Sequence, residues 1–192
     1  MRTGDSKRQE EVIISGFGGQ GALFAGQLLA YAAMDAGKHV TWIPSYGPEM
    51  RGGTAHCTVI ISDDEIGSPL VRHPSAAIVL NIPSMDKYEP LVKPGGVLVV
   101  NSSLVPRRSE REEIQVVYVP ANTIAEELGS ARMANVVCLG ALVEVLGIVT
   151  VEQVEAALDA HLPARKRDLL ELNKQALRRG AEIAREQTMV PA

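Results

Sequence analysis

Short apolar segments alternate with longer helical patterns along the first two thirds of the chain, and turn-forming residues separate them. Residues 11–15 and 39–43 are rich in β-branched side chains, which favour strands. Between them, residues 19–36 are apolar on nearly every face, which predicts a helix packed on several sides. Strand, glycine-rich turn, helix and strand within about 30 residues predict a βαβ unit. The second strand is expected to end at Pro44, because proline lacks the N–H of a strand ladder.

The same pattern predicts four further strands, at residues 54–62, 76–81, 97–101 and 115–119, and a short hairpin partner at residues 68–71. A short helix at residues 83–92 is expected to break at Pro90. The last third turns helical, with apolar or amphipathic segments at residues 121–128, 134–146, 151–162 and 164–187. Thr150 and Gln153 have the spacing of a capping box at the start of the third of these helices.

These elements predict an α/β fold, a Rossmann-like three-layer domain with a mostly parallel sheet and a helical C-terminal third. Residues 1–10 are expected to form a mobile N-terminal tail, residues 11–187 a single domain, and residues 188–192 a C-terminal tail. The polar start of the chain lacks the apolar core of a signal peptide. The apolar stretch at residues 134–151 contains Glu144, so a buried helix explains it better than a membrane span.

Composition excludes several classes of function. Aromatic residues make up 4% of the chain, so the core is expected to consist mainly of aliphatic side chains. With a formal charge of −4, the chain lacks the basic surface that nucleic-acid binding needs. Cys57 and Cys138 lie in apolar runs without a CxxC pair, which argues against a cysteine-ligated metal or cluster and suits a reducing cytoplasm. The four histidines share no spacing typical of metal ligands, and His56 is expected to be structural or interface-facing.

Gly16, Gly18 and Gly21 match the G-x-G-x-x-G pattern of a turn between a strand and a helix. One interpretation is a cradle for an anion or nucleotide, because glycines let a ligand approach the backbone at a helix N-terminus. The other is a tight connection with close helix–sheet packing and no ligand. The second strand ends without the acidic residue that holds the ribose of NAD, which disfavours a dehydrogenase. Gly21 is not followed by Lys-Ser/Thr, which excludes a P-loop.

The segment PSYGPEMRGG follows the second strand and is too rich in proline and glycine for regular structure. It places Tyr46, Glu49 and Arg51 at the carboxyl end of a parallel strand, where open α/β sheets bind ligands and partners. Arg51 is able to grip a phosphate or carboxylate through two N–H groups. The alternative is a contact between Glu49 and Arg51 that braces the loop. Asn81 and Asn101 end strands at the same edge; each can bind a ligand or cap the following turn, and capping is favoured.

Five segments share their sequence with a known family: GFGGQG, PSYGPEMRGGTAHCTVIIS, NIPSMDKY, LVKPGGVLVVNSS and MANVVCLGALVEVLG. Together they resemble the gamma subunit of 2-oxoacid:ferredoxin oxidoreductases, and the resemblance runs from residue 11 to residue 187. It implies a complex that oxidises a 2-oxoacid with coenzyme A to acyl-CoA, carbon dioxide and reduced ferredoxin. It also implies alpha and beta subunits that hold thiamine diphosphate and magnesium between them. Iron–sulfur clusters would carry electrons to a ferredoxin-like delta subunit or to ferredoxin.

For this chain, the resemblance implies a role in assembly and in the coenzyme A channel. The cofactor-binding residues that it implies are those of the turn and the loop: Gly16, Gly18, Gly19, Gln20, Gly21, Tyr46, Glu49 and Arg51. No catalytic residue and no metal ligand is assigned, because the chain lacks a magnesium–thiamine signature and cysteine clusters. By itself the chain is therefore expected to bind no cofactor. The loop sequence favours a 2-oxoglutarate enzyme over pyruvate, branched-chain or indolepyruvate relatives. The alternatives are a stand-alone nucleotide-binding or regulatory domain and a free NAD- or flavin-dependent enzyme.

Overall fold

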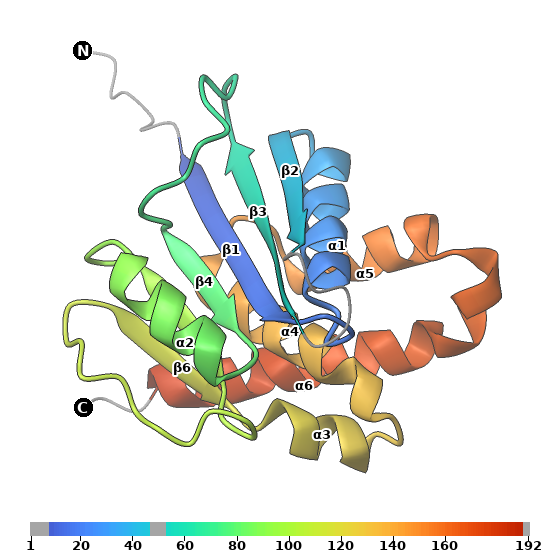
Figure 1. Ribbon diagram of the computed structural model, residues 1–192. Coiled ribbons are helices and arrows are strands. Elements are labelled where there is room, and N and C mark those ends of the chain that lie inside the picture. The colour runs from blue at the N-terminus through green and yellow to red at the C-terminus, as the bar shows by residue number, and fades with distance from the viewer. Residues whose placement is uncertain (1–7, 47–52, 190–192) are drawn as a thin grey trace.

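The computed structural model describes residues 8–46 and 53–189, and one mixed sheet of six strands lies at its centre (Figure 1). The strands lie in the order β2-β3-β1-β4-β5-β6. Their bounds are β1 Gln9–Phe17, β2 His39–Tyr46, β3 Thr54–Ser62, β4 Ala76–Val79, β5 Val97–Asn101 and β6 Gln115–Val119. Of these strands, only β3 runs antiparallel to its neighbours, β1 and β2, whereas β1, β4, β5 and β6 pair in parallel. The other five strands therefore end at one edge of the sheet, which we call the carboxyl edge, and the predicted α/β fold is confirmed.

The predicted βαβ unit is present, but its two strands are not neighbours. Helix α1 (Ala22–Asp35) connects β1 to β2, and β3 lies between those strands and is antiparallel to both. The expectation that the second strand ends at Pro44 is wrong, because β2 continues to Tyr46 with Pro44 opposite Cys57. Strand β2 is at the end of the sheet and pairs only with β3, so proline is tolerated where the missing N–H faces away from the ladder.

Helices cover the two faces of the sheet unequally (Figure 1). One face carries α1, α3 (Ala121–Glu127), α4 (Ala134–Leu146), α5 (Val151–His161) and α6 (Leu170–Met189), and the other carries the short α2 (Ile82–Tyr88). Successive residues of β1 point to opposite faces. Ile14 lies in the core beneath the five helices, whereas Ile13 packs with Met85 and Tyr88 of α2. The predicted three-layer arrangement is confirmed, with one thick and one thin layer.

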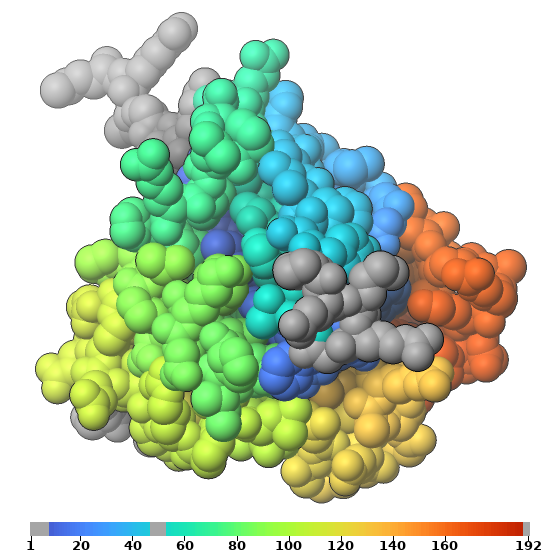
Figure 2. Space-filling model, in the orientation of Figure 1, coloured from blue at the N-terminus to red at the C-terminus, as the bar shows by residue number. Residues whose placement is uncertain are grey.

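The described part of the thin layer leaves some residues of the sheet exposed. On the face opposite to α1, β2 and β3 present Thr41, Ile43, Ser45 and Thr58, all of them at least partly exposed. The side chain of Ile43 is 40% exposed. In the space-filling view, the cyan and teal atoms of β2 and β3 reach the surface beside the green segments around α2 (Figure 2).

Helices α4 and α6 cross at two glycines. A Cβ atom added to Gly140 would overlap the carbonyl oxygen of Leu177, and one added to Gly180 would overlap the carbonyl oxygen of Val137. Both distances would be well below 3.0 Å, and real Cβ atoms essentially never come that close to another heavy atom. The two helices therefore touch backbone to backbone, and neither position has room for a side chain.

The sequence predicted one domain with a tail at each end, and the start of β1 can be compared with the predicted N-terminal boundary. Strand β1 begins at Gln9, which pairs with Ser62, so the sheet includes two residues that were expected to belong to the N-terminal tail. The pairing extends this far because β3 is nine residues long and offers a partner to each residue of β1. Residues 1–7 and 190–192 lie outside the described part of the chain. The division into one domain with two tails stays a prediction.

The capping box is confirmed, because Thr150 N donates to Gln153 Oε1 at 2.8 Å and Gln153 N donates to Thr150 Oγ1 at 3.2 Å. The helix expected from residue 164 begins instead with a 3-10 helix, Ala164–Leu169, which has no buried residue to hold it against the core. The hairpin partner expected at residues 68–71 is wrong, because this segment forms no strand and its Leu70 is 81% exposed. None of the helices in the described ranges is long and apolar enough to cross a membrane.

Candidate functional site

The side-chain amide of Gln20 holds the turn between β1 and α1. Gln20 Oε1 accepts a hydrogen bond from Phe17 N at 2.6 Å and another from Asn81 Nδ2 at 2.9 Å. Gly18 N donates to Gly53 O at 2.9 Å, which ties the turn to the segment just before β3. The turn is therefore fixed by contacts within the protein. The side-chain oxygen of Gln20, Oε1, already accepts two hydrogen bonds there.

The glycines of the turn have different roles. A Cβ atom on Gly16 would lie 2.8 Å from Gln20 Oε1, and one on Gly21 would overlap the side-chain amide of Asn135. Close packing, one of the two interpretations of the glycine pattern, therefore explains these two positions. Gly19 has a φ of +95°, and apart from its chain neighbours no atom of the described residues lies within 4 Å of the place where its Cβ would stand. Among the described residues, this position therefore leaves room beside the backbone.

Asn81 and Asn101 follow different patterns, although both were expected to cap a turn. Asn81 does so, because its Oδ1 accepts a hydrogen bond from Ser84 N at 2.9 Å at the start of α2. The side chain of Asn101 instead donates through Nδ2 to Asn122 Oδ1 at 2.8 Å and to Leu80 O at 3.4 Å. Asn101 is 1% exposed, and its Oδ1 has no hydrogen-bond partner within the protein. The expectation is therefore confirmed for Asn81 and wrong for Asn101.

Asn135, in the first turn of α4, has the same arrangement as Asn101. Its Nδ2 donates to Gly21 O at 3.0 Å, and its Oδ1 has no partner although the residue is only 4% exposed. A backbone carbonyl only accepts hydrogen bonds, so Gly21 O fixes the nitrogen end of Asn135, and the longer contact with Leu80 O favours the same orientation for Asn101. Of the buried side-chain nitrogen and oxygen atoms that the structure describes, three lack a partner, and two of these are the oxygens of Asn101 and Asn135.

Both unpartnered residues line one pocket of about 200 Å³ at the carboxyl edge, which we call the amide pocket. Its walls are the turn at Gly19 and Gln20, the ends of β4 and β5, the first turn of α3 and the start of α4. Among the described residues that line it, Arg132 is the only charged one, and it is exposed. None of these described residues carries a carboxylate, imidazole or thiol. Its chemistry is suited to binding through hydrogen bonds and not to acid–base catalysis.

The residues that the sequence assigned to the site separate in the structure. Gly19 and Gln20 line the amide pocket. Tyr46 ends β2 with its side chain 73% exposed and is not part of the pocket wall. Glu49 and Arg51 lie outside the described residues.

Sequence reasoning missed three polar side chains of the pocket, those of Asn122, Arg132 and Asn135. The available signal was an amide at the start of the otherwise apolar segment NVVCLGALV. Burying an amide there needs a polar partner, which the turn supplies through a backbone carbonyl.

Outside the amide pocket, the burial of His56, Cys57 and Cys138 indicates structural roles for these residues. Burial, and secondly Lys87, lower the pKa of His56, whose ring packs against Tyr88 at 5.7 Å between centroids. Burial raises the pKa of Cys57 to about 11 and that of Cys138 to about 12, which keeps both thiols protonated. Within residues 8–46 and 53–189, no group of three or more His, Cys, Asp or Glu side chains could hold a metal ion.

Large apolar side chains stand exposed along the carboxyl edge. They are Phe17 and Tyr46 at the ends of β1 and β2, Ile82 after β4 and Leu104 after β5, and we call them the apolar rim. Their exposed fractions run from 36% to 73%. Exposed apolar side chains that gather at one place are typical of surfaces that contact another protein.

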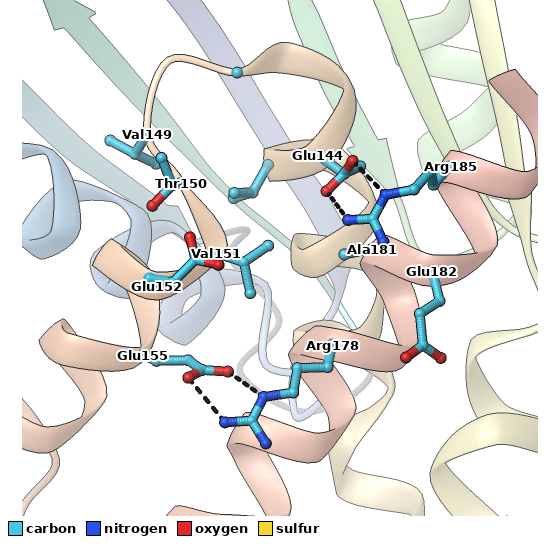
Figure 3. A pocket seen from close by; sticks show the side chains of 12 residues that line it. Glu144, Val149, Thr150, Val151, Glu152, Glu155, Arg178, Ala181, Glu182 and Arg185 are labelled. Carbon is cyan, nitrogen blue, oxygen red and sulfur yellow. Dashed lines mark hydrogen bonds and ion pairs between the residues drawn. The ribbon is translucent and has the colours of Figure 1, made fainter. Parts of the chain in front are cut away.

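A larger pocket of about 530 Å³ lies between the C-terminal end of α4, α5 and α6 (Figure 3). Four of its charged side chains form two bidentate pairs: Arg185 with Glu144 at 2.8 and 2.9 Å, and Arg178 with Glu155 at 2.6 and 2.9 Å. The guanidinium groups therefore already have carboxylate partners. None of the unpartnered buried atoms in the described chain lines this pocket. The amide pocket is the better candidate for a ligand site.

Known proteins are similar in sequence to nearly the whole chain. Residues 11–183 match the family model described as pyruvate ferredoxin/flavodoxin oxidoreductase. The chain is 39% identical to the ketoisovalerate oxidoreductase subunit VorA of Methanothermobacter marburgensis, over 93% of this chain but only 37% of that protein. It is 37% identical to the 2-oxoglutarate synthase subunit KorC of Methanocaldococcus jannaschii, over 94% of this chain and 96% of that protein.

The fold is also similar to a solved structure. The gamma subunit of a keto/oxoacid ferredoxin oxidoreductase from Geobacter sulfurreducens superposes with a TM-score of 0.79 at 36% identity. The match covers 92% of this chain and 99% of that subunit. The chain thus spans just over a third of the length of VorA and nearly all of KorC and of the solved subunit.

Proposed function

This chain belongs to the pyruvate ferredoxin/flavodoxin oxidoreductase family, and we propose that it acts as the gamma subunit of a 2-oxoacid:ferredoxin oxidoreductase. The complex would oxidise a 2-oxoacid with coenzyme A and yield acyl-CoA, carbon dioxide and reduced ferredoxin. The observation that carries the proposal is the match in length. The chain covers 96% of a KorC subunit and 99% of a solved gamma subunit, but 37% of the longer VorA. The remaining parts of the reaction therefore belong to other polypeptides or other domains.

The proposed partners are the thiamine-binding alpha and beta subunits and a ferredoxin-like delta subunit or ferredoxin. In this proposal, thiamine diphosphate, magnesium and the iron–sulfur clusters are bound by those partners. The apolar rim supports a protein contact at the carboxyl edge, because its four large side chains are exposed there. A reducing cytoplasm is the proposed location, since both cysteines are free and buried.

We place the contact with coenzyme A at the same edge. The open backbone at Gly19 and the amide pocket beside it support this placement. Of the other residues assigned from the sequence, Tyr46 ends β2 at this edge. Glu49 and Arg51 follow it in the chain and stay part of the proposal, as do Gly16, Gly18, Gln20 and Gly21.

The proposed oxoacid is 2-oxoglutarate. The support is the full-length likeness to KorC, named as a 2-oxoglutarate synthase subunit. The likeness to VorA, named for ketoisovalerate, is as strong in identity but extends over little more than a third of that protein.

The test is purification of the tagged chain from its native cell. The expected result is recovery of larger thiamine- and cluster-bearing chains with coenzyme A-dependent reduction of ferredoxin. Assays with 2-oxoglutarate, pyruvate and 3-methyl-2-oxobutanoate then identify the substrate. A lone chain that binds a nucleotide and recovers no partner would refute the proposal and favour the stand-alone domain.

A further inference from the structure

A further pocket lies between α1, the end of α5 and the 3-10 helix Ala164–Leu169. Helix α5 packs against α1 in the thick layer (Figure 1). The pocket has a volume of about 250 Å³, and we call it the α1–α5 pocket. It shares no lining residue with the amide pocket, so the two are separate places on the protein.

Much of the wall of the α1–α5 pocket is apolar. Leu28, Leu158 and Leu162 line it and are at most 6% exposed, so its apolar part is continuous with the core. Phe24 and Tyr31 line it from α1 and are partly exposed. An apolar or aromatic group that enters this pocket would therefore leave water for a surface that is already apolar, which favours binding.

Two cations, Arg165 and Lys166, belong to the same wall. Both residues are exposed, and neither makes an ion pair within the described part of the chain. Lys166 Nζ lies 5.3 Å from the centroid of the Phe24 ring, which places an ammonium group beside the aromatic part of the wall. None of the described residues that line the pocket carries a carboxylate. The pocket therefore combines positive charge with apolar surface, in a chain whose formal charge is −4.

The one imidazole of the wall is held by its neighbours. His161 Nε2 lies 2.8 Å from Asp35 Oδ2, and the His161 ring stacks on Tyr31 with 4.1 Å between centroids and 5° between the ring planes. Asp35 is not among the residues that line the pocket, and its carboxylate is engaged by the imidazole. The charge of Asp35 is therefore directed to His161, and the two lining cations stay available to a ligand.

These features set three requirements for a ligand. Pockets that enclose a drug-sized molecule measure roughly 300–1,000 Å³, and the α1–α5 pocket is smaller, so the ligand is a small molecule. Guanidinium and ammonium groups bind carboxylates and phosphates through charge-assisted hydrogen bonds, so the ligand carries an anionic group. The apolar wall requires a hydrocarbon or aromatic body. An inorganic anion would leave that wall unused, and a neutral molecule would leave the cations unused.

We propose that the α1–α5 pocket binds a small organic anion, with its anionic group at Arg165 and Lys166 and its apolar body beside Phe24. The 3-10 helix that carries both cations has no buried residue. A bound anion would therefore add contacts between this helix and α1. The inference does not depend on the proposed function, and its failure would leave the assignment as a gamma subunit unchanged.

The first test titrates the full chain with three probes of matched build. Phenylacetate has an aromatic ring and a carboxylate, phenylacetamide is its neutral counterpart, and acetate lacks the ring. Phenylacetate is expected to bind with a Kd at least about tenfold lower than that of either other probe. Equal binding of phenylacetamide would mean that the cations are not used, and equal binding of acetate would mean that the apolar wall is not used. Either result would overturn the proposal.

The two phenylalanines of the chain allow the place of binding to be located. Phe24 lines the pocket, whereas Phe17 ends β1 and does not. In a chain with isotope-labelled phenylalanine, phenylacetate is expected to shift the ring resonances of Phe24 and to leave those of Phe17 unchanged. No shift of Phe24 at millimolar phenylacetate, or an equal shift of Phe17, would contradict the assignment.

Substitutions in the 3-10 helix test the role of the two cations. Arg165→Gln and Lys166→Gln are each expected to weaken the binding of phenylacetate about five- to tenfold, because each removes a charged donor. Both variants are expected to fold, since no residue of this helix is buried. The matched control is Arg167→Gln, which removes the same charge from an exposed residue of the same helix that does not line the pocket. Equal weakening in all three variants would indicate general attraction between charges, and unchanged binding in all three would exclude the cations; both results would refute the site.

Discussion

The crossing of α4 and α6 determines whether a substitution of Gly180 raises or lowers the free energy of unfolding. Gly180→Ala adds one methyl group at a position where a Cβ atom would overlap the carbonyl oxygen of Val137. The obstacle is backbone, so no side-chain rotation relieves it. The two helices must separate by on the order of 1 Å to restore ordinary van der Waals contact.

Two effects of opposite sign set the magnitude. Overpacking a tight core is unfavourable by about 1–3 kcal/mol, and a backbone obstacle belongs at the upper end of that range. Alanine, however, favours a helix over glycine by about 0.8–1.0 kcal/mol. We therefore expect Gly180→Ala to lower the free energy of unfolding by about 2 kcal/mol. For a chain of this size, that corresponds to a fall in Tm of roughly 4–8 °C.

The assay is thermal and urea unfolding of the full chain, followed by circular dichroism. The matched control is Gly67→Ala, because Gly67 has no atom within 4 Å of its Cβ position and no left-handed φ. Gly67→Ala is expected to leave Tm unchanged within a degree or two, about the range of neutral surface substitutions. A Tm for Gly180→Ala that equals or exceeds that of the wild type would mean that the helices do not touch here.

Two further predictions concern titratable groups. Burial raises the pKa of Cys57 to about 11 and of Cys138 to about 12, so neither thiol of the native chain should react with iodoacetamide at neutral pH, and rapid labelling seen by mass spectrometry would contradict this. Burial, and secondly the charge of Lys87, lower the pKa of His56 below its ordinary 6.5 in the folded chain. As pH falls, the imidazole of His56 is therefore protonated in the unfolded chain before it is protonated in the folded chain. The contribution of His56 to folding stability is therefore present above pH 6.5 and is lost as pH falls toward its folded pKa. His56→Gln should reduce this loss and the exposed His73→Gln should not, and equal pH slopes in both variants would refute the reasoning.

Most strands were predictable because each is a run of β-branched residues between turns. The bounds of β3, β5 and β6 agree with those expected from sequence. The extension of β2 past Pro44 was not predictable, because a proline is tolerated only if the strand is at the end of the sheet. That position follows from the insertion of β3 between β1 and β2, a long-range pairing that local pattern does not contain.

The candidate site was predictable only in part, for a similar reason. The glycine pattern located the turn, but not that Gly16 and Gly21 are required by contacts with Gln20 and Asn135. Asn135 lies 114 positions from Gly21, so no local spacing connects them. Only the packing of α4 against the turn brings the two together.

The two asparagines at the amide pocket are held through their side-chain nitrogens. Each nitrogen donates to a backbone carbonyl, and each oxygen is buried without a partner in the described protein. Folding of the free chain then includes an unfavourable contribution of about 1–3 kcal/mol for each acceptor that lacks a donor. The same fixed acceptors cannot activate a carbonyl or carry an electron. In the proposed complex, this chain would therefore recognise the cofactor, while the partner subunits supply the groups that react.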